Sequence, residues 1–205
     1  MQPSETTRTE AFSDGVFAIA ITLLIIEVHV PAAEHAGDLS HQLLDLWPSY
    51  LGYLTSFLTI GVMWVNHHRV FSLIDRVDHT MLILNLVLLL LIAFLPFPTA
   101  VLARFIETEG ARQAAALYGV TMVLIAIAFF SWWRYASFDR RLIAATAPQE
   151  EVDDITRAYT PGTILYAGAL ALAFVEPWAS AAAYLALALF YALPLQQWQQ
   201  KLARR

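Results

Sequence analysis

The sequence predicts an all-α, polytopic membrane protein with six transmembrane helices in each subunit. Of its 205 residues, 59% are hydrophobic and only 14% are charged, whereas a soluble domain is about 45–50% apolar and about 25% charged. A soluble domain of this length leaves roughly a third of its surface in water, so a chain this apolar is excluded from that class. The same composition excludes intrinsic disorder, which needs low hydrophobicity and high charge.

The charge and the cysteine count exclude several further classes. The net charge of −5 makes nucleic acid an unexpected partner. The chain has no cysteine, which excludes disulfides, thiolate metal sites and thiol nucleophiles. Its opening residues, MQPSETTRTE, hold one cation and two acids, a poor start for a signal peptide. The first apolar run is therefore expected to be retained as a membrane helix.

Six apolar stretches have about the length that a membrane crossing requires. A bilayer core of about 30 Å needs about 20 mostly apolar residues in each helix. We expect these helices over residues 10–30, 48–68, 79–102, 112–133, 161–175 and 178–195, within a single transmembrane domain of residues 1–205. The longest linker, residues 134–160, has room for one interfacial helix.

Prolines mark the breaks between these helices. Pro48 suits the first turn of the second helix, where its missing N–H is not needed. Pro96 and Pro98 predict a kink near the end of the third helix. Thr160–Pro161 is typical of an N-cap followed by the first helical residue, and residues 176–178 predict a tight hairpin between the last two helices.

The distribution of cations predicts the orientation. If the N-terminus is cytoplasmic, ten of the 12 Lys and Arg residues fall on inner segments, and the outer loops hold only Arg104 and Arg112. Cytoplasmic loops carry the excess of positive charge in membrane proteins. We therefore expect a multi-pass protein of the cell membrane with both termini in the cytoplasm. The outer loops carry six acids, which are Glu34, Asp38, Asp45, Glu107, Glu109 and Glu176.

The helix over residues 10–30 carries an unusual pattern. At about 100° per residue, Thr22 lies about 60° to one side of Ile19, and Asp14 points about 140° away from it. One face of the helix therefore combines a branched aliphatic stripe with a hydroxyl, while the acid lies on the other side of the helix. Such a stripe, taken alone, more often serves packing or lipid contact. Its members are Arg8, Phe12, Gly15, Ile19, Leu23, Ile26 and Val30.

Polar residues of the first three helices share one depth in the cytoplasmic third of the membrane. An ionisable residue in lipid is costly, which makes Asp14 a candidate for function. The alternative is a structural acid, which we expect to be satisfied inside the subunit by an Arg, His or Asn. The layer would then clamp the first helix against the second and third. Its members are Arg8, Ser13, Asp14, Asn66, His67, His68 and Asn85.

Other chemistries remain as alternatives. A metal site is unexpected, because adjacent histidines point to different sides of a helix and the spacing fits no standard zinc pattern. Its candidate ligands would be His67, His68, Asp75, Asp78 and His79. A proton-coupled secondary transporter using Asp14 or Glu27 is a second possibility. A third is a membrane-embedded enzyme using Asp14 and His67, or a structural protein without ion flux.

The segment RTEAFSDGVFAIAITLLIIEV resembles the signature of the endolysosomal transmembrane potassium channel family, in particular its prokaryotic members. That signature is an arginine, three residues and then Phe-Ser-Asp. The GVFAIAITLL that follows, the NHHR end of the second helix and the FLPFPT end of the third also resemble the family. The resemblance covers the six-helix layout, with its specific motifs in the first three helices. The signature falls on Arg8, Phe12, Ser13 and Asp14.

The resemblance implies a potassium-selective leak channel, not an enzyme, that needs no cofactor. Prokaryotic members are homotetramers whose pore is lined by the first helix, without a re-entrant filter, and this sequence has no TVGYG-like segment. The family's constriction residues fall on Ile19, Leu23 and Ile26, and its hydroxyl layer falls on Thr22. Behind this pore lining we expect a structural polar layer of Arg8, Phe12, Ser13, Asp14, His67, His68 and Asn85.

Overall fold

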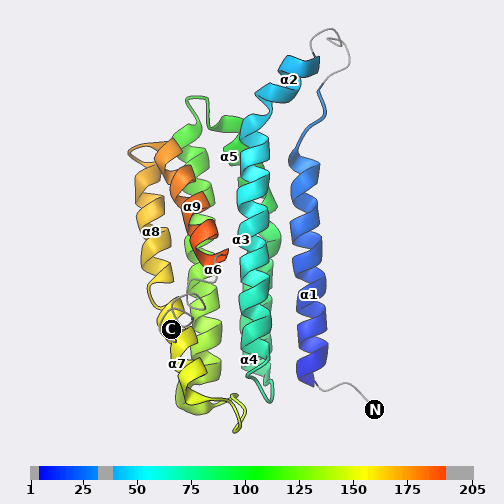
Figure 1. The fold of residues 1–205 in the computed structure, drawn as a ribbon, viewed down its shortest axis with the longest axis vertical. Coiled ribbons are helices and arrows are strands. Elements are labelled where there is room, and N and C mark those ends of the chain that lie inside the picture. Colours follow the sequence, from blue (N-terminus) through cyan, green and yellow to red (C-terminus); the bar gives the residue numbers. More distant parts are fainter. Residues whose placement is uncertain (1–4, 32–38, 193–205) are drawn as a thin grey trace, which may run out of the picture.

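The computed structural model describes residues 5–31 and 39–192 of the chain. These residues are helical almost throughout, and their extended pairing is limited to one isolated antiparallel bridge between Ile74 and Ile143. Figure 1 shows the longest helices running side by side along the long axis of the molecule. The predicted all-α class is therefore confirmed.

The first apolar stretch forms helix α1, Glu5–Leu23, which continues as a 3₁₀ turn, η1, over Leu24–Glu27. Its α-helical part thus begins earlier than predicted and ends well before residue 30. A short helix that the sequence did not predict, α2 (Leu39–Asp45), precedes the long helix α3 (Trp47–Phe71). Pro48 lies in the first turn of α3, where a proline leaves no hydrogen bond unmade.

The third apolar stretch is divided into α4 (His79–Phe94) and α5 (Pro96–Phe105). The break falls at Leu95, directly before Pro96. Proline has no amide hydrogen to donate, and its ring crowds the preceding turn. The expected interruption is therefore present at the first of the two prolines, while Pro98 lies inside α5.

Helix α6 (Ala111–Ser137) ends in a second 3₁₀ turn, η3 (Phe138–Arg140). Helices α7 (Gln149–Tyr159) and α8 (Gly162–Ala173) then follow one another alongside α6 (Figure 1). The sequence predicted a helix that starts at Pro161 with Thr160 as its N-cap. Instead Thr160 is the C-cap of α7 and Pro161 is the N-cap of α8. The two helices therefore form one bent segment.

A tight turn joins α8 to α9 (Pro177–Ala192). Among the described residues, three helical stretches are long and apolar enough to cross a bilayer, which are Glu5–Glu27, His79–Phe105 and Ala111–Arg140. Helix α9 is a shorter apolar helix. A protein with several such stretches is embedded in a membrane.

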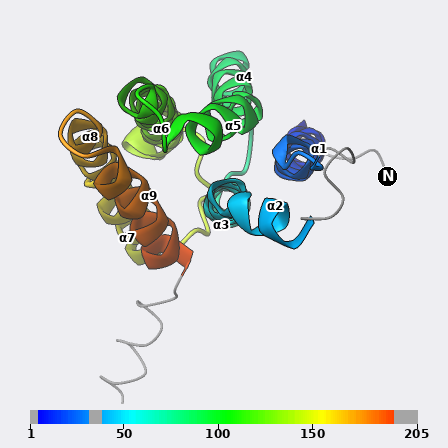
Figure 2. The same cartoon turned by 90° about the horizontal axis from the view of Figure 1, so that it is seen from above.

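The interior is packed between α3, α4 and α6. Fully buried side chains there include Ile60 of α3, Leu88 and Ile92 of α4, and Trp132 of α6. Trp133 of α6 is buried against α7. Helix α1 lies at the edge of this bundle, beside α3 and α4 (Figure 2). Only one face of α1 packs against the bundle, and this asymmetry defines the candidate site.

The loops after α3 and α6 are joined at the end of the bundle where α1 begins. The amide of Asp75 donates to the carbonyl of Leu142 at 3.0 Å, and the amide of Ala144 donates to the carbonyl of Leu73 at 2.9 Å. The Arg76 guanidinium also donates to the carbonyl of Arg141 at 3.0 Å. These bonds fix the start of α4 relative to the end of α6.

Asp78 caps α4 at this junction. Its carboxylate accepts hydrogen bonds from the Met81 amide and the Tyr135 hydroxyl, both at 2.8 Å. Desolvation raises the pKa of the Asp78 carboxyl, but these hydrogen bonds and the charge of Arg141 outweigh it and lower the pKa below its ordinary value of 3.8. The cap therefore stays ionised, and stabilising, until the pH falls through that lowered value.

Helices α6, α8 and α9 approach one another closely at Gly119. A Cβ at Gly119 of α6 would lie 2.7 Å from both Leu170 Cδ1 and the Tyr184 hydroxyl. Gly119→Ala should therefore force α8 and α9 apart and lower the free energy of unfolding by about 1–3 kcal/mol. Gly168→Ala in α8 is the control, because a Cβ there meets nothing within 4 Å. Thermal unfolding in detergent measures both, and equal midpoints would contradict this account of the packing.

Candidate functional site

Helix α1 has two different faces. The face towards α3 and α4 is buried and holds Ser13, Phe17, Ala20 and Leu24. The opposite face holds the predicted stripe. Ile19 is 61%, Leu23 41% and Ile26 68% exposed in the single chain.

The stripe continues past the end of the α-helix. Leu23 is the last residue of α1, and Ile26 lies in the 3₁₀ turn η1. In a 3₁₀ helix the side chains at i and i+3 eclipse one another, so Ile26 stays on the same face as Leu23. The 3₁₀ turn thus preserves the alignment that the sequence predicted for a continuous α-helix. Val30 lies beyond the turn and is not part of the helical face.

Thr22 is exposed beside this stripe. Its hydroxyl oxygen lies 2.9 Å from the carbonyl oxygens of Ala18 and Ile19, to which it donates. Because the hydroxyl hydrogen is used within the helix, the oxygen lone pairs are free to accept from, or to coordinate, a group outside α1. A hydroxyl held in this way presents a partial negative charge beside the aliphatic side chains.

A buried row of hydrogen bonds fastens the other face of α1. The Ser13 hydroxyl donates to the carbonyl of Thr9 and accepts from Asn85 Nδ2, each at 2.9 Å. Asn85 Oδ1 in turn accepts from His67 Nε2 at 3.0 Å. The row therefore links α1, α4 and α3. His67 stacks on Trp132 with ring centroids 4.8 Å apart.

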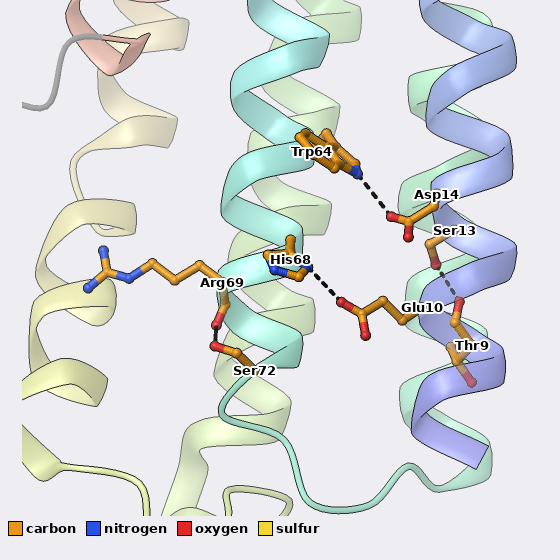
Figure 3. Close-up of polar contacts among 8 residues, drawn as sticks. All are labelled: Thr9, Glu10, Ser13, Asp14, Trp64, His68, Arg69 and Ser72. Atoms are coloured by element: carbon orange, nitrogen blue, oxygen red, sulfur yellow. Dashed lines mark hydrogen bonds and ion pairs between the residues drawn. The ribbon is translucent and has the colours of Figure 1, made fainter. Parts of the chain in front are cut away.

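Two further contacts join α1 to α3 nearer the surface (Figure 3). The Trp64 indole donates to Asp14 Oδ1 at 2.9 Å, and His68 Nδ1 lies 2.8 Å from Glu10 Oε1. The partner of Asp14 is thus a tryptophan rather than the Arg, His or Asn that we expected. An indole N–H is a donor that suits the edge of a membrane bundle, since the rest of the ring is apolar.

The remaining members of the predicted polar layer are dispersed. Arg8 is exposed, and Phe12 is 56% exposed on the face of the aliphatic stripe. His67 and His68 lie on different sides of α3, with different partners. Among the described residues, no group of three or more His, Cys, Asp or Glu side chains is placed to hold a metal ion.

Sequence reasoning missed Trp64 and Glu10. The sequence does hold a feature that could have pointed to them. Glu10 lies four residues before Asp14 on α1, and Trp64 lies four residues before His68 on α3. Residues at that interval lie on the same helix face. Only the packing of α1 on α3 brings the two pairs together.

At the opposite end of α1, a hollow of about 660 Å³ opens beside η1. Ionisable residues line it from three segments, with Glu27 and His29 after α1, Asp45 before α3, and Arg104 and Glu107 around the end of α5. Three acids against one arginine leave the hollow negative. Of the outer acids noted in the sequence, Glu34 and Asp38 lie outside the described residues.

The polar contacts predict an order of stability losses. Asn85→Ala removes two bonds from buried partners and should lower the free energy of unfolding by about 1–3 kcal/mol. Asp14→Ala removes one bond to the half-exposed Trp64 and should cost roughly 1 kcal/mol. Thermal unfolding and the oligomer content in detergent measure both. Full stability of Asp14→Ala together with altered ion selectivity would instead mean that Asp14 lines the ion path.

Comparison with known proteins is consistent with this geometry. A model of the family described as endosomal/lysosomal potassium channel TMEM175 matches residues 8–96. A potassium channel of Chamaesiphon minutus is 50% identical over 94% of this chain and 96% of its own length. One of Streptomyces collinus is 45% identical over 92% of each chain.

A solved structure is similar as well. The crystal structure of a lysosomal potassium-selective channel TMEM175 homolog from Chamaesiphon minutus superposes with a TM-score of 0.84 and 49% identity. The alignment covers 92% of this chain and 96% of that one. Identity of this level over nearly the whole of both chains establishes common descent. The chain belongs to the TMEM175 family.

Proposed function

We propose that the chain is the subunit of a potassium-selective leak-type channel whose pore is lined by α1. One observation carries this proposal. The face of α1 with Ile19, Leu23 and Ile26 is exposed in the single chain, while the opposite face is fastened to α3 and α4. The names of the bacterial relatives as potassium channels support the choice of ion.

The channel is proposed to be a homotetramer. With α1 at the edge of each subunit (Figure 2), four copies placed around an axis turn the exposed stripes towards one another. Each subunit would cross the cell membrane six times, with α1, α3, α4–α5, α6, α8 and α9 as the crossings and α7 as the interfacial helix of the linker between α6 and α8. The excess of cations at the end where α1 begins supports a cytoplasmic location for that end and for both termini.

The stripe supplies the barrier to ions. Rings of Ile19, Leu23 and Ile26 offer no polar group, so an ion that passes them loses part of its hydration shell. Potassium sheds water more readily than sodium does, which gives a modest preference for potassium. The free lone pairs of Thr22 replace part of the lost water. A hydrophobic constriction also closes by dewetting, so small movements of α1 gate the pore.

A proton-coupled transporter is the competing function from another class, with Asp14 or Glu27 as the proton carrier. Potassium flux into liposomes that hold the purified protein, with sodium as the comparison, tests the proposal. A channel gives unitary currents in planar bilayers, and a coupled transporter gives saturable flux that follows the proton gradient. No flux of either ion would mean a membrane protein without transport activity.

Substitutions in the stripe should change permeation. Ile19→Asn or Leu23→Ala wets or widens a ring, so the conductance should rise severalfold and the preference for potassium over sodium should weaken. Reversal potentials under K⁺/Na⁺ gradients measure the selectivity. Ile21→Ala is the control, because Ile21 is partly buried against the core. Ile25 does not serve as one, since it is 53% exposed. A selectivity shift in the control alone would place another face of α1 in the pore.

The negative hollow should concentrate cations at the outer mouth. Neutralising Glu27, Asp45 and Glu107 to glutamine or asparagine should lower the inward potassium conductance at low salt, by about twofold or more. The effect should shrink at high salt, because the screening length falls from about 30 Å at 0.01 M to about 3 Å at 1 M. Single-channel conductance at both salt concentrations is the measurement. An equal loss at both would contradict the electrostatic explanation.

A further inference from the structure

Two contacts, here called rungs, connect α1 to α3 near the end where α1 begins. We call the four residues Glu10, Asp14, Trp64 and His68 the clasp. One rung is the bond from Trp64 to Asp14, and the other is the contact of His68 with Glu10 at 2.8 Å. The rungs are joined on α3, where the Trp64 and His68 rings stack 6.3 Å apart.

Protons can reach the second rung. The His68 side chain is 64% exposed, whereas that of Glu10 is 26% exposed. Histidine is the side chain whose charge ordinarily changes between about pH 5 and 8. A protonated imidazole forms an ion pair with the Glu10 carboxylate, and a neutral one offers only a weaker, uncharged hydrogen bond.

The charged and titratable groups around His68 come from α1, from α3 and from the loop after α3. From α1 it faces Glu10, with Asp14 one turn further along, and Arg8 on that helix is exposed. On α3 itself, His67 is buried against Asn85. Arg69 points the other way, to Glu151 of α7 (Figure 3). The loop after α3 contributes Asp75, whose carbonyl accepts from Thr6 of α1.

We infer that the His68–Glu10 rung is a proton-binding site that regulates the channel from the face where α1 begins, which the proposed orientation places in the cytoplasm. The inference rests on the proposed function, in which α1 lines the pore. Protonation draws the start of α1 towards α3 of its own subunit and away from the central axis. Acidification of this face therefore widens the pore and raises the potassium current.

The size of the effect follows from the exposure of the rung. An exposed ion pair changes the equilibrium between two conformations of a protein by a factor of about 1.5–5. Acting on a pore that four subunits share, it should raise the current at least about threefold between pH 8 and pH 5.5. Deprotonation leaves α1 fastened by the Ser13–Asn85–His67 row and by Trp64, so the protein stays folded and assembled at pH 8.

The test is potassium current through the purified channel in planar bilayers, with the pH changed on one face at a time. The wild-type current should rise on acidification of one face only. His68→Gln and Glu10→Gln should remove the response and leave the current near its pH 8 level. His68→Arg keeps a cation at every pH, so its current should stay near the pH 5.5 level. His79→Gln, an exposed histidine at the start of α4, should respond as the wild type does.

Several results would overturn the inference. One is a potassium current that does not change with pH on either face, and another is an unchanged response in His68→Gln. A His68-dependent fall in current on acidification would also contradict it, because the clasp would then close the pore. Absence of any potassium current in the wild type would instead overturn the proposed function. Thermal unfolding of each variant at pH 8 verifies that the variants are folded.

Discussion

The hydrogen-bonded row from Ser13 through Asn85 to His67 decides how α1 sits on the subunit. All three side chains are buried to 2% exposure or less, and in a membrane a buried polar group without a partner costs several kcal/mol. A rotation of α1 about its axis would break the Ser13–Asn85 bond and leave the Asn85 amide group without its partner on α1. A single orientation of α1 therefore keeps the Ser13–Asn85 bond, and the contacts of Asp14 and Glu10 with α3 reinforce it.

In that orientation one face of α1 packs against the subunit and the other face is exposed. Phe17, Ala20 and Leu24 fill the buried face. Ile19, Leu23 and Ile26 are turned outward. The change from α to 3₁₀ geometry at Leu24 keeps Ile26 in line with Leu23. An exposed apolar face on a helix that is firmly held on its other side suits assembly around an axis.

The second half of the chain supports the arrangement of α3 and α4. Helices α6, α8 and α9 pack closely at Gly119, where a side chain would collide with Leu170 and Tyr184. The bend at Pro161 lets the segment α7–α8 follow α6. The loop pairing at Asp75 and Ala144 ties this half to the start of α4. Through α4 and α3 the support holds the row that positions α1.

Hydropathy and periodicity by themselves determined the helical class, the interruption at Pro96 and the stripe of Ile19, Leu23 and Ile26, because these features depend on spacing within one helix. They also marked Ser13, His67 and Asn85 as a polar layer by depth. The pairing within that layer was decided by tertiary structure. Asp14 binds Trp64, and Glu10 binds His68, because the rotation of α1 against α3 fixes which side chains meet. That rotation depends on packing across three helices, and no interval in a single sequence specifies it.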